Sequence, residues 1–147
     1  MSNVMQVSIY TDGACDPNPG PGGWAVLLRF GKHEKILTGS EPNTTNNRME
    51  MVAAIQAFHA LKQPCQIEFF TDSEYLKKGI TEWMPKWQKR NWRRKGGVLA
   101  NPDLWQELAA IIQPHMINWH WVRGHAGNRE NQLVDRLAKQ SIHRRLP

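Results

Sequence analysis

The sequence predicts an α/β fold in which a five-stranded mixed sheet carries helices on both faces. Short apolar stretches that suit strands alternate with longer segments of helical periodicity. The early turns, rich in Gly, Pro and Asn, indicate antiparallel hairpins, and the later strand–helix–strand passages indicate parallel strands. With 147 residues and a hydrophobic fraction of 40%, we expect a single domain spanning residues 1–147.

The predicted elements begin with a meander of three strands, after which helices and strands alternate. The strands are expected at Val4 to Thr11, Trp24 to Phe30, about Glu34 to Gly39, Ile67 to Thr71 and Asn118 to Val122. The helices are expected at Asn46 to Leu61, Ser73 to about Gly79, about Trp83 to Gln88, Asn101 to about Gln113 and about Glu130 to His143.

Local signals set several helix boundaries. The first helix has one apolar face at helical spacing, formed by Met49, Ala53, Ala57 and Leu61. Asn101 and Pro102 supply an N-cap and a first-turn proline for a later helix. Pro85 cannot lie deep inside a helix, so the helix around it starts near Thr81 or Glu82 or is kinked.

Four acidic residues lie where a sheet-and-helix domain gathers side chains. Asp12 closes the first strand and Asp72 closes the fourth, each in a Thr-Asp pair, while Glu50 lies early in the first helix and Asp135 in the last. Hard oxygen ligands without cysteine favour magnesium or manganese over zinc. Four adjacent carboxylates would also repel one another unless cations joined them. Taken singly, each acid has an alternative interpretation as a solvated charge or a helix cap.

The net charge of +6 is unevenly distributed. A basic segment without acidic residues is interleaved with Trp87 and Trp92, and its cations are Lys86, Lys89, Arg90, Arg93, Arg94 and Lys95. Such a segment suits a polyanion, because cations displace condensed counterions and indoles pack against sugars or bases. The alternative is a solvated loop whose tryptophans merely anchor it.

Five segments, taken in order over nearly the whole chain, resemble the bacterial type 1 ribonucleases H. They are YTDGACDPNPGPGGW, TTNNRMEMVAAIQA, TDSEYLKKGITEW, NPDLWQEL and WVRGHAGNRENQLVDRLA. The resemblance implies a ribonuclease H-like fold and an endonuclease, a hydrolase of the RNA strand of RNA/DNA hybrids that leaves 5′-phosphate and 3′-hydroxyl ends. It also implies two Mg²⁺ ions, with Mn²⁺ as a substitute, held by Asp12, Glu50, Asp72 and Asp135, of which Asp12 bridges both ions.

The resemblance also implies substrate contacts. They are the Cys15 backbone, Asn18, Thr45, Asn46, Asn47 and Glu74, together with a basic protrusion that contributes Trp83, Lys86, Trp87, Lys89, Arg90 and Trp92. His125 becomes a proton shuttle that assists product release, since imidazole titrates near neutral pH. Two departures are Asp16 and Glu74, which are acidic where neutral residues are expected; the family usually has glutamine at position 74. We expect their extra charge beside the metals to weaken hybrid binding or shift the preferred ion.

Simpler interpretations stay open for three of these motifs. TTNN is also an ordinary helix-capping cluster, and His125 is also an ordinary loop histidine. DPNPGPGGW lacks the GxxxxGK[ST] pattern and is expected to be a tight hairpin connection.

Two rival functions remain alongside the ribonuclease H. One is another metal nuclease of the same fold, such as a DNA-cleaving resolvase or integrase-like domain, although these lack the motif series and the tryptophan-bearing protrusion. The other is a hybrid-binding module without catalysis, although pure binding would not need four converging carboxylates. The chain shows no signal peptide and no long apolar stretch, so we expect a cytoplasmic monomer, away from membranes, whose Cys15 and Cys65 are reduced thiols.

Overall fold

The computed structural model describes residues 4–90, 100–122 and 129–144. Their strands are β1 (Met5–Cys15), β2 (Gly20–Phe30), β3 (His33–Thr44), β4 (Cys65–Thr71) and β5 (Met116–Trp121). Their helices are α1 (Asn46–His59), α2 (Glu74–Lys78), the π-helical turn η1 (Gly79–Trp83), α3 (Met84–Lys89), α4 (Pro102–Ile111) and α5 (Arg129–Arg144). None of the described helices is long and apolar enough to cross a membrane.

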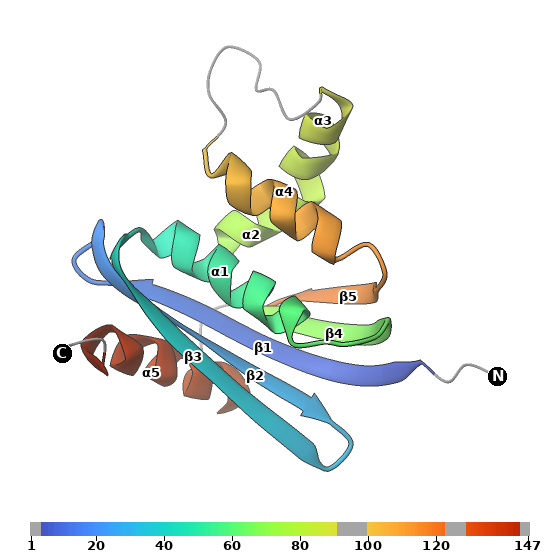
Figure 1. The fold of residues 1–147 in the computed structure, drawn as a ribbon, viewed down its shortest axis with the longest axis horizontal. Coiled ribbons are helices and arrows are strands. Elements are labelled where there is room, and N and C mark those ends of the chain that lie inside the picture. Colours follow the sequence, from blue (N-terminus) through green and yellow to red (C-terminus); the bar gives the residue numbers. More distant parts are fainter. Residues whose placement is uncertain (1–3, 91–99, 123–128, 145–147) are drawn as a thin grey trace.

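The strands form one mixed sheet in the order β3-β2-β1-β4-β5. β1 pairs antiparallel with β2 and parallel with β4, while β2–β3 is antiparallel and β4–β5 is parallel. Helices α1 and α4 lie above the sheet and α5 lies below it (Figure 1). This arrangement confirms the predicted five-stranded mixed sheet with helices on both faces.

Alternation along the strands divides the apolar side chains between two cores. Ile9 of β1 and Phe69 of β4 are completely buried in the larger core under α1 and α4. Tyr10 points to the other face, where it packs with Val134 and Ala138 of α5. The sheet is therefore buried on both faces where helices cover it.

The β1–β2 hairpin is longer than the sequence predicted. β1 continues past Thr11 to Cys15, which pairs with Gly22, and β2 therefore begins at Gly20 rather than at Trp24. The glycines that suggested a turn lie inside the ladder because neighbouring elements pack closely there. A Cβ on Gly23 would lie 2.3 Å from the carbonyl oxygen of Ala138 in α5.

Other boundaries shifted by a few residues. β3 extends from His33 to Thr44 because it follows the longer β2 along its whole length, and α1 ends at His59, before Leu61. The last strand begins two residues earlier than predicted, at Met116. These shifts leave the order and type of the elements unchanged.

The two helix-start predictions held in part. The helix expected at about Trp83 to Gln88 is α3 (Met84–Lys89), with Pro85 in its first turn, but it continues without a break from α2 through the π-helical turn Gly79–Trp83 and does not start anew at Thr81 or Glu82. Asn101 precedes α4 as predicted but does not cap it through its side chain. Its amide instead donates to the Tyr75 hydroxyl at 2.9 Å.

Candidate active site

The two strand acids meet because the parallel ladder between β1 and β4 ends at the pair Tyr10 and Phe70. Asp12 and Asp72 each lie two residues beyond that pair, so both carboxylates reach the same edge of the sheet. The sequence suggested that Asp12 closes its strand, but β1 continues beyond it to Cys15. Asp12 pairs with Ala25 of β2 on one side and borders the opening next to β4 on the other.

Glu50 reaches this edge because α1 lies directly on β1. A Cβ on Gly13 would lie 2.4 Å from the carbonyl carbon of Met49, so only glycine allows this approach. The backbone N–H of Gly13 donates to the Glu50 carboxylate at 2.6 Å and to the Asp12 carboxylate at 2.9 Å. Gly13 is therefore part of the site, although sequence reasoning assigned it no role.

The acids gather at a hollow of about 430 Å³. Ligand oxygens of Asp12, Glu50 and Asp72 lie within 4.8 Å of one another. Asp135 comes from α5 on the opposite face of the sheet and lines the same hollow, where it acts on Asp12 by charge and hydrogen bonding. The Asp135 carboxylate also makes a salt bridge of 3.2 Å with Lys139, a hollow-lining residue that sequence reasoning missed.

Burial and mutual repulsion act on these carboxyl groups in the same direction. Burial, with the nearby Asp72 charge second, raises the pKa of Asp12 to about 8. Burial and the Asp12 charge raise the pKa of Glu50 well above its usual value, against the opposing hydrogen bond from Gly13. Without a cation, the folded protein therefore holds protons here at neutral pH that an exposed pair of acids would release.

This set of donors suits a hard divalent cation. Asp12 is 5% exposed and Glu50 6% exposed, so water alone cannot stabilise their charges. All three clustered side chains offer carboxylate oxygen, and no cysteine or histidine belongs to the cluster among the described residues. Oxygen ligands of this kind are those that Mg²⁺ or Mn²⁺ prefers.

Two of the predicted substrate-contact residues, Thr45 and Asn18, accept hydrogen bonds from backbone N–H groups at the start of α1. Thr45 is its N-cap, with its hydroxyl accepting from the Arg48 N–H at 3.2 Å. The Asn18 side chain, from the β1–β2 turn, accepts from the Asn46 N–H at 3.1 Å. The capping interpretation of TTNN therefore holds for Thr45. Asn46 and Asn47 line the acidic hollow.

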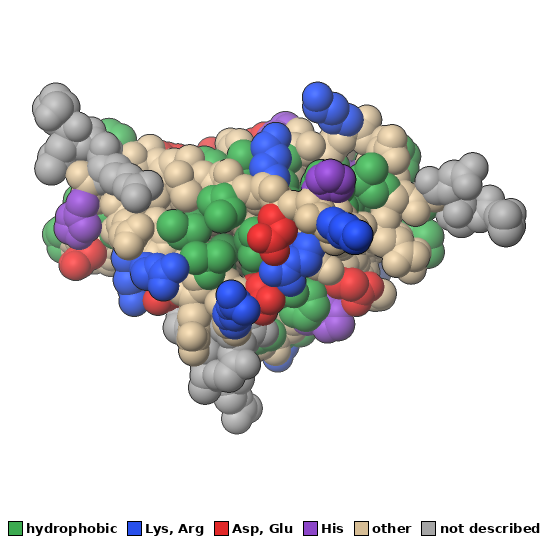
Figure 2. All heavy atoms as spheres, turned by 90° about the horizontal axis from the view of Figure 1, so that it is seen from below, with side chains coloured by type: hydrophobic (Ala, Val, Ile, Leu, Met, Phe, Trp, Pro, Cys, Tyr) green, Lys and Arg blue, Asp and Glu red, His purple; other side chains and the backbone are tan. Residues whose placement is uncertain are grey.

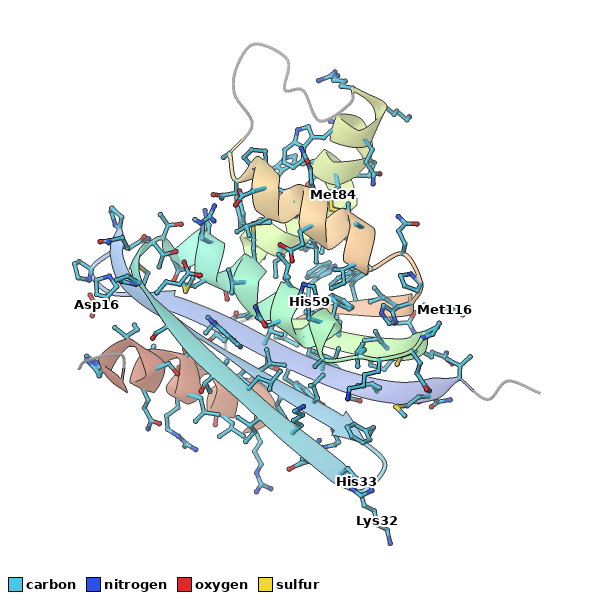
Figure 3. All side chains as sticks on the ribbon, in the orientation of Figure 1. Asp16, Lys32, His33, His59, Met84 and Met116 are labelled. Carbon is cyan, nitrogen blue, oxygen red and sulfur yellow. The ribbon has the colours of Figure 1, made fainter. Side chains whose placement is uncertain are left out.

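The two acidic departures lie in different places. Glu74 is exposed at the start of α2 and lines the hollow, so its charge does act near the four acids. Asp16 is exposed at the outer end of the β1–β2 connection (Figure 3) and does not belong to the hollow's lining. The expectation of extra charge beside the site therefore applies to Glu74 alone. The neighbouring Cys15 is half-buried, with its thiol 3.3 Å from the Pro17 carbonyl.

The described part of the basic segment is packed against the core through aromatic side chains. Trp83 and Trp87 are half-buried and pack against the fully buried Trp105, with ring centroids 6.4 Å and 5.6 Å away. Gly79 makes room for this packing, because a Cβ there would overlap the Trp105 ring. These tryptophans therefore anchor the segment, as the simpler interpretation held. Lys86, Lys89 and Arg90 are exposed.

Five residues of the predicted site lie outside the described parts of the chain: Trp92, Arg93, Arg94, Lys95 and His125. A connection that the sequence did not suggest joins α1 to the start of α4: the Arg48 guanidinium donates to Asn101 at 3.1 Å and makes a salt bridge of 3.1 Å with Asp103. It ties the helix that carries Glu50 to the start of α4.

Comparison with known proteins identifies the family. The family model described as RNase H matches residues 4–143. The chain belongs to the ribonuclease H family. The ribonuclease H of Bradyrhizobium sp. (strain ORS 278) is 54% identical over 143 residues, which cover 97% of this chain and 93% of that protein. As a member of this family, the chain is an enzyme, a nuclease.

Solved structures of related proteins agree with this membership. LC9-RNase H1, a type 1 RNase H with the type 2 active-site motif, has a TM-score of 0.89 and 33% identity, covering 99% of this chain and 76% of that one. LC11-RNase H1, solved in complex with an RNA/DNA hybrid, has a TM-score of 0.65 and 20% identity, covering 96% of this chain and 99% of that one. The second likeness concerns the fold alone.

Proposed function

We propose that this chain is an endonuclease that hydrolyses the RNA strand of RNA/DNA hybrids. The observation that carries the proposal is the convergence of Asp12, Glu50 and Asp72 within 4.8 Å, beside the amide-bearing start of α1. Buried carboxylates with raised pKa are unfavourable without cations, and a pure binding module gains nothing from them. A catalytic metal site explains why they are retained.

The proposed chemistry needs two divalent ions at the hollow. Asp12, Glu50, Asp72 and Asp135 would hold two Mg²⁺ ions, which would supply activation of the attacking water and stabilisation of the departing 3′ oxygen and so leave 5′-phosphate and 3′-hydroxyl ends. Asp12 would be the ligand shared by both ions, because its carboxylate lies close to those of Glu50 and Asp72 and also interacts with Asp135. Mn²⁺ is the expected substitute, since it accepts the same oxygen donors.

Selection for RNA is assigned to the polar side chains around the hollow. Asn46 and Asn47 line it from the first turn of α1 and present amide groups that both donate and accept hydrogen bonds. Such groups read 2′-hydroxyls across the wide, shallow minor groove of an A-form duplex. Asn18, Thr45, the Cys15 backbone and Glu74 surround the same region, and His125 is proposed to move a proton during product release.

Binding of the DNA strand is assigned to α3. Lys86, Lys89 and Arg90 are exposed on a helix whose tryptophans are fixed against the core. A rigid cationic surface suits a duplex backbone, because ordered cations release counterions without a large loss of loop entropy. The cytoplasmic location, the monomeric state and the single domain stay predictions.

Cleavage assays test the proposal directly. The protein is incubated with Mg²⁺ and matched, end-labelled RNA/DNA, RNA/RNA and DNA/DNA duplexes, and we expect cleavage only in the RNA strand of the hybrid. Glu50→Gln should abolish it, while Glu107→Gln, which removes an exposed carboxylate of α4 outside the hollow, should not. Cleavage of DNA/DNA would favour the resolvase-like rival, and tight hybrid binding without cleavage would favour the binding module.

A further inference from the structure

The outer face of α5 carries a continuous polar and basic stripe. Its members recur at i, i+3, i+7, i+10 and i+14 and share one side of the helix. They are Arg129, Gln132, Arg136, Lys139 and His143, and all are exposed. The helix packs on the sheet through Val134 and Ala138, on the opposite side. Its acids, Glu130 and Asp135, lie off the stripe.

The stripe is continuous with the acidic hollow. Lys139 lines that hollow and contacts Asp135 at 3.2 Å. Arg129, Gln132 and Arg136 line a second hollow of about 520 Å³ between α5 and the β2–β3 hairpin. Figure 2 looks from below onto the side of the molecule where α5 lies, and shows Lys and Arg side chains on this surface. A nucleic-acid strand that extends from the acidic hollow along α5 would therefore contact these cations next.

The two arginine charges of the stripe are available to a partner, whereas the charge of Lys139 is shared with Asp135. Arg29 lines the second hollow too, but it is neutralised by Glu34 at 2.6 Å and by Glu130 at 3.1 Å. Within the described parts of the chain, neither Arg129 nor Arg136 makes a salt bridge. An arginine without an internal partner keeps its planar fork of N–H donors for an external anion such as phosphate.

We propose that this stripe is a second phosphate-binding surface, occupied by the backbone of the nucleic-acid duplex where it extends beyond the acidic hollow. The stripe is ~21 Å long at the rise of an α-helix, which matches about six phosphates of one strand. The inference rests on the proposed function in that it takes the same polyanion as its occupant. The α5 stripe would add phosphate contacts on the face of the sheet opposite to α3.

Salt-dependent binding of a long RNA/DNA hybrid tests this surface. Binding is measured in EDTA, so that it does not depend on cleavage, for wild type and for the double variant Arg129→Gln, Arg136→Gln. The variant should lower the slope of log affinity against log salt by about 1 to 2, since each neutralised phosphate contributes about 0.9. In Mg²⁺ its KM should rise about 5-fold while kcat falls much less.

Matched variants separate a specific surface from general charge. Arg129→Lys, Arg136→Lys keeps both charges and should keep most of the wild-type slope. Lys32→Gln, Lys35→Gln removes two exposed cations at the far end of the β2–β3 hairpin, where Figure 3 labels Lys32, and should change the slope little. A double Gln variant that binds with the wild-type slope, or whose slope falls no further than that of the hairpin control, overturns the proposal. Failure of the wild type to cleave hybrids would overturn the proposed function instead, and leave this binding result standing.

Discussion

The acidic hollow and helix α3 both concentrate charges of one sign, but the protein holds them in opposite ways. In the hollow, Asp12 and Glu50 are buried and share the N–H of a single glycine, Gly13. On α3, Lys86 and Lys89 stay in water while the tryptophans beneath them are packed into the core. Buried like charges raise one another's pKa and require cations, whereas exposed like charges are screened and act additively.

This difference predicts two kinds of response to mutation. Replacing any one carboxylate of the hollow should abolish nearly all turnover, because the carboxylates are expected to bind the metal ions together. Changes on α3 should act on affinity in proportion to the number of charges removed, because each exposed cation contributes its own counterion release.

Asp12→Asn should have the largest effect on cleavage. It removes the carboxylate that we propose as the ligand shared by both metal ions, while keeping nearly the same side-chain shape. Turnover should fall by about 10⁴-fold or more, because the bridging charge cannot be supplied by an amide. Steady-state cleavage of a labelled hybrid in Mg²⁺ measures this loss. Retention of more than a few per cent of wild-type activity would show that the acids act independently, as the exposed cations do.

Gly13→Ala should come next, although it changes no charge. Its new methyl group must push α1 away from β1, since the Cβ would lie 2.4 Å from the Met49 carbonyl carbon. We expect turnover to fall by about 10²-fold, because small displacements of catalytic groups have effects of that size. Unfolding free energy should fall by about 2 kcal/mol from overpacking. Kinetics and denaturant unfolding measure the two effects.

Gly31→Ala is the control for backbone strain alone. Gly31 has a φ of 59° and a Cβ there would contact nothing within 4 Å. The variant should be about 1 kcal/mol less stable at unchanged turnover. Equal turnover losses in the two glycine variants would contradict the role given to the α1–β1 approach.

His125→Ala should lower turnover by about 10²-fold or less and leave hybrid affinity nearly unchanged. This moderate loss is expected because we propose that His125 transfers a proton during product release and does not bind a metal ion. Single-turnover kinetics and binding measured in parallel check it. Complete loss of activity in a folded variant would make His125 an essential base or ligand, and an unaltered rate would return it to an ordinary loop residue.

The α3 variant Lys86→Ala, Lys89→Ala, Arg90→Ala should act on hybrid affinity and change turnover little. Its KM should rise about 10-fold, and the salt dependence of binding should flatten by about 0.9 for each phosphate that the variant no longer neutralises. Because the side chains are exposed, the melting temperature should stay close to that of the wild type. Unchanged affinity and salt slope would make α3 a solvated surface without a binding role.

The order of elements and the position of the acids could be predicted from the sequence because both follow from local patterns. Alternating apolar residues located β1 and β4, and the repeated Thr-Asp pair located the acids next to them. The resemblance to a known family then supplied roles that no spacing contains, such as the bridging role of Asp12. Those roles remain proposals.

What the sequence did not predict depends on contacts between distant elements. The extension of β1 to Cys15 comes from pairing with β2 across glycines that resembled turn residues. The side chain of Asn101 hydrogen-bonds to Tyr75 and Arg48 instead of capping α4. Both partners come from other helices, so the local sequence around Asn101 does not reveal them. Likewise, Trp83 and Trp87 face the core because Gly79 leaves room for Trp105. A pattern along the chain cannot show which side chain finds a tertiary partner.

We infer that a cation relieves the repulsion among three clustered carboxylates, of which Asp12 and Glu50 are buried and Asp72 is partly exposed. Because the pKa of Asp12 is raised from 3.8 to about 8, the folded state keeps a proton that the unfolded chain releases. Its contribution to stability is present below pH 4 and is lost as the pH rises toward 8. An asparagine at position 12 does not titrate, so its advantage should grow with pH over that window.

Melting curves of wild type and Asp12→Asn at pH 4 and pH 7, each with and without Mg²⁺, test this claim most directly. Without metal at pH 7 the variant should melt about 5 °C or more above the wild type, and at pH 4 the difference should nearly vanish. Mg²⁺ should stabilise the wild type more than the variant. A variant that melts no higher than the wild type at pH 7 without metal, and still cleaves hybrids normally, would contradict both the electrostatic cluster and its catalytic role.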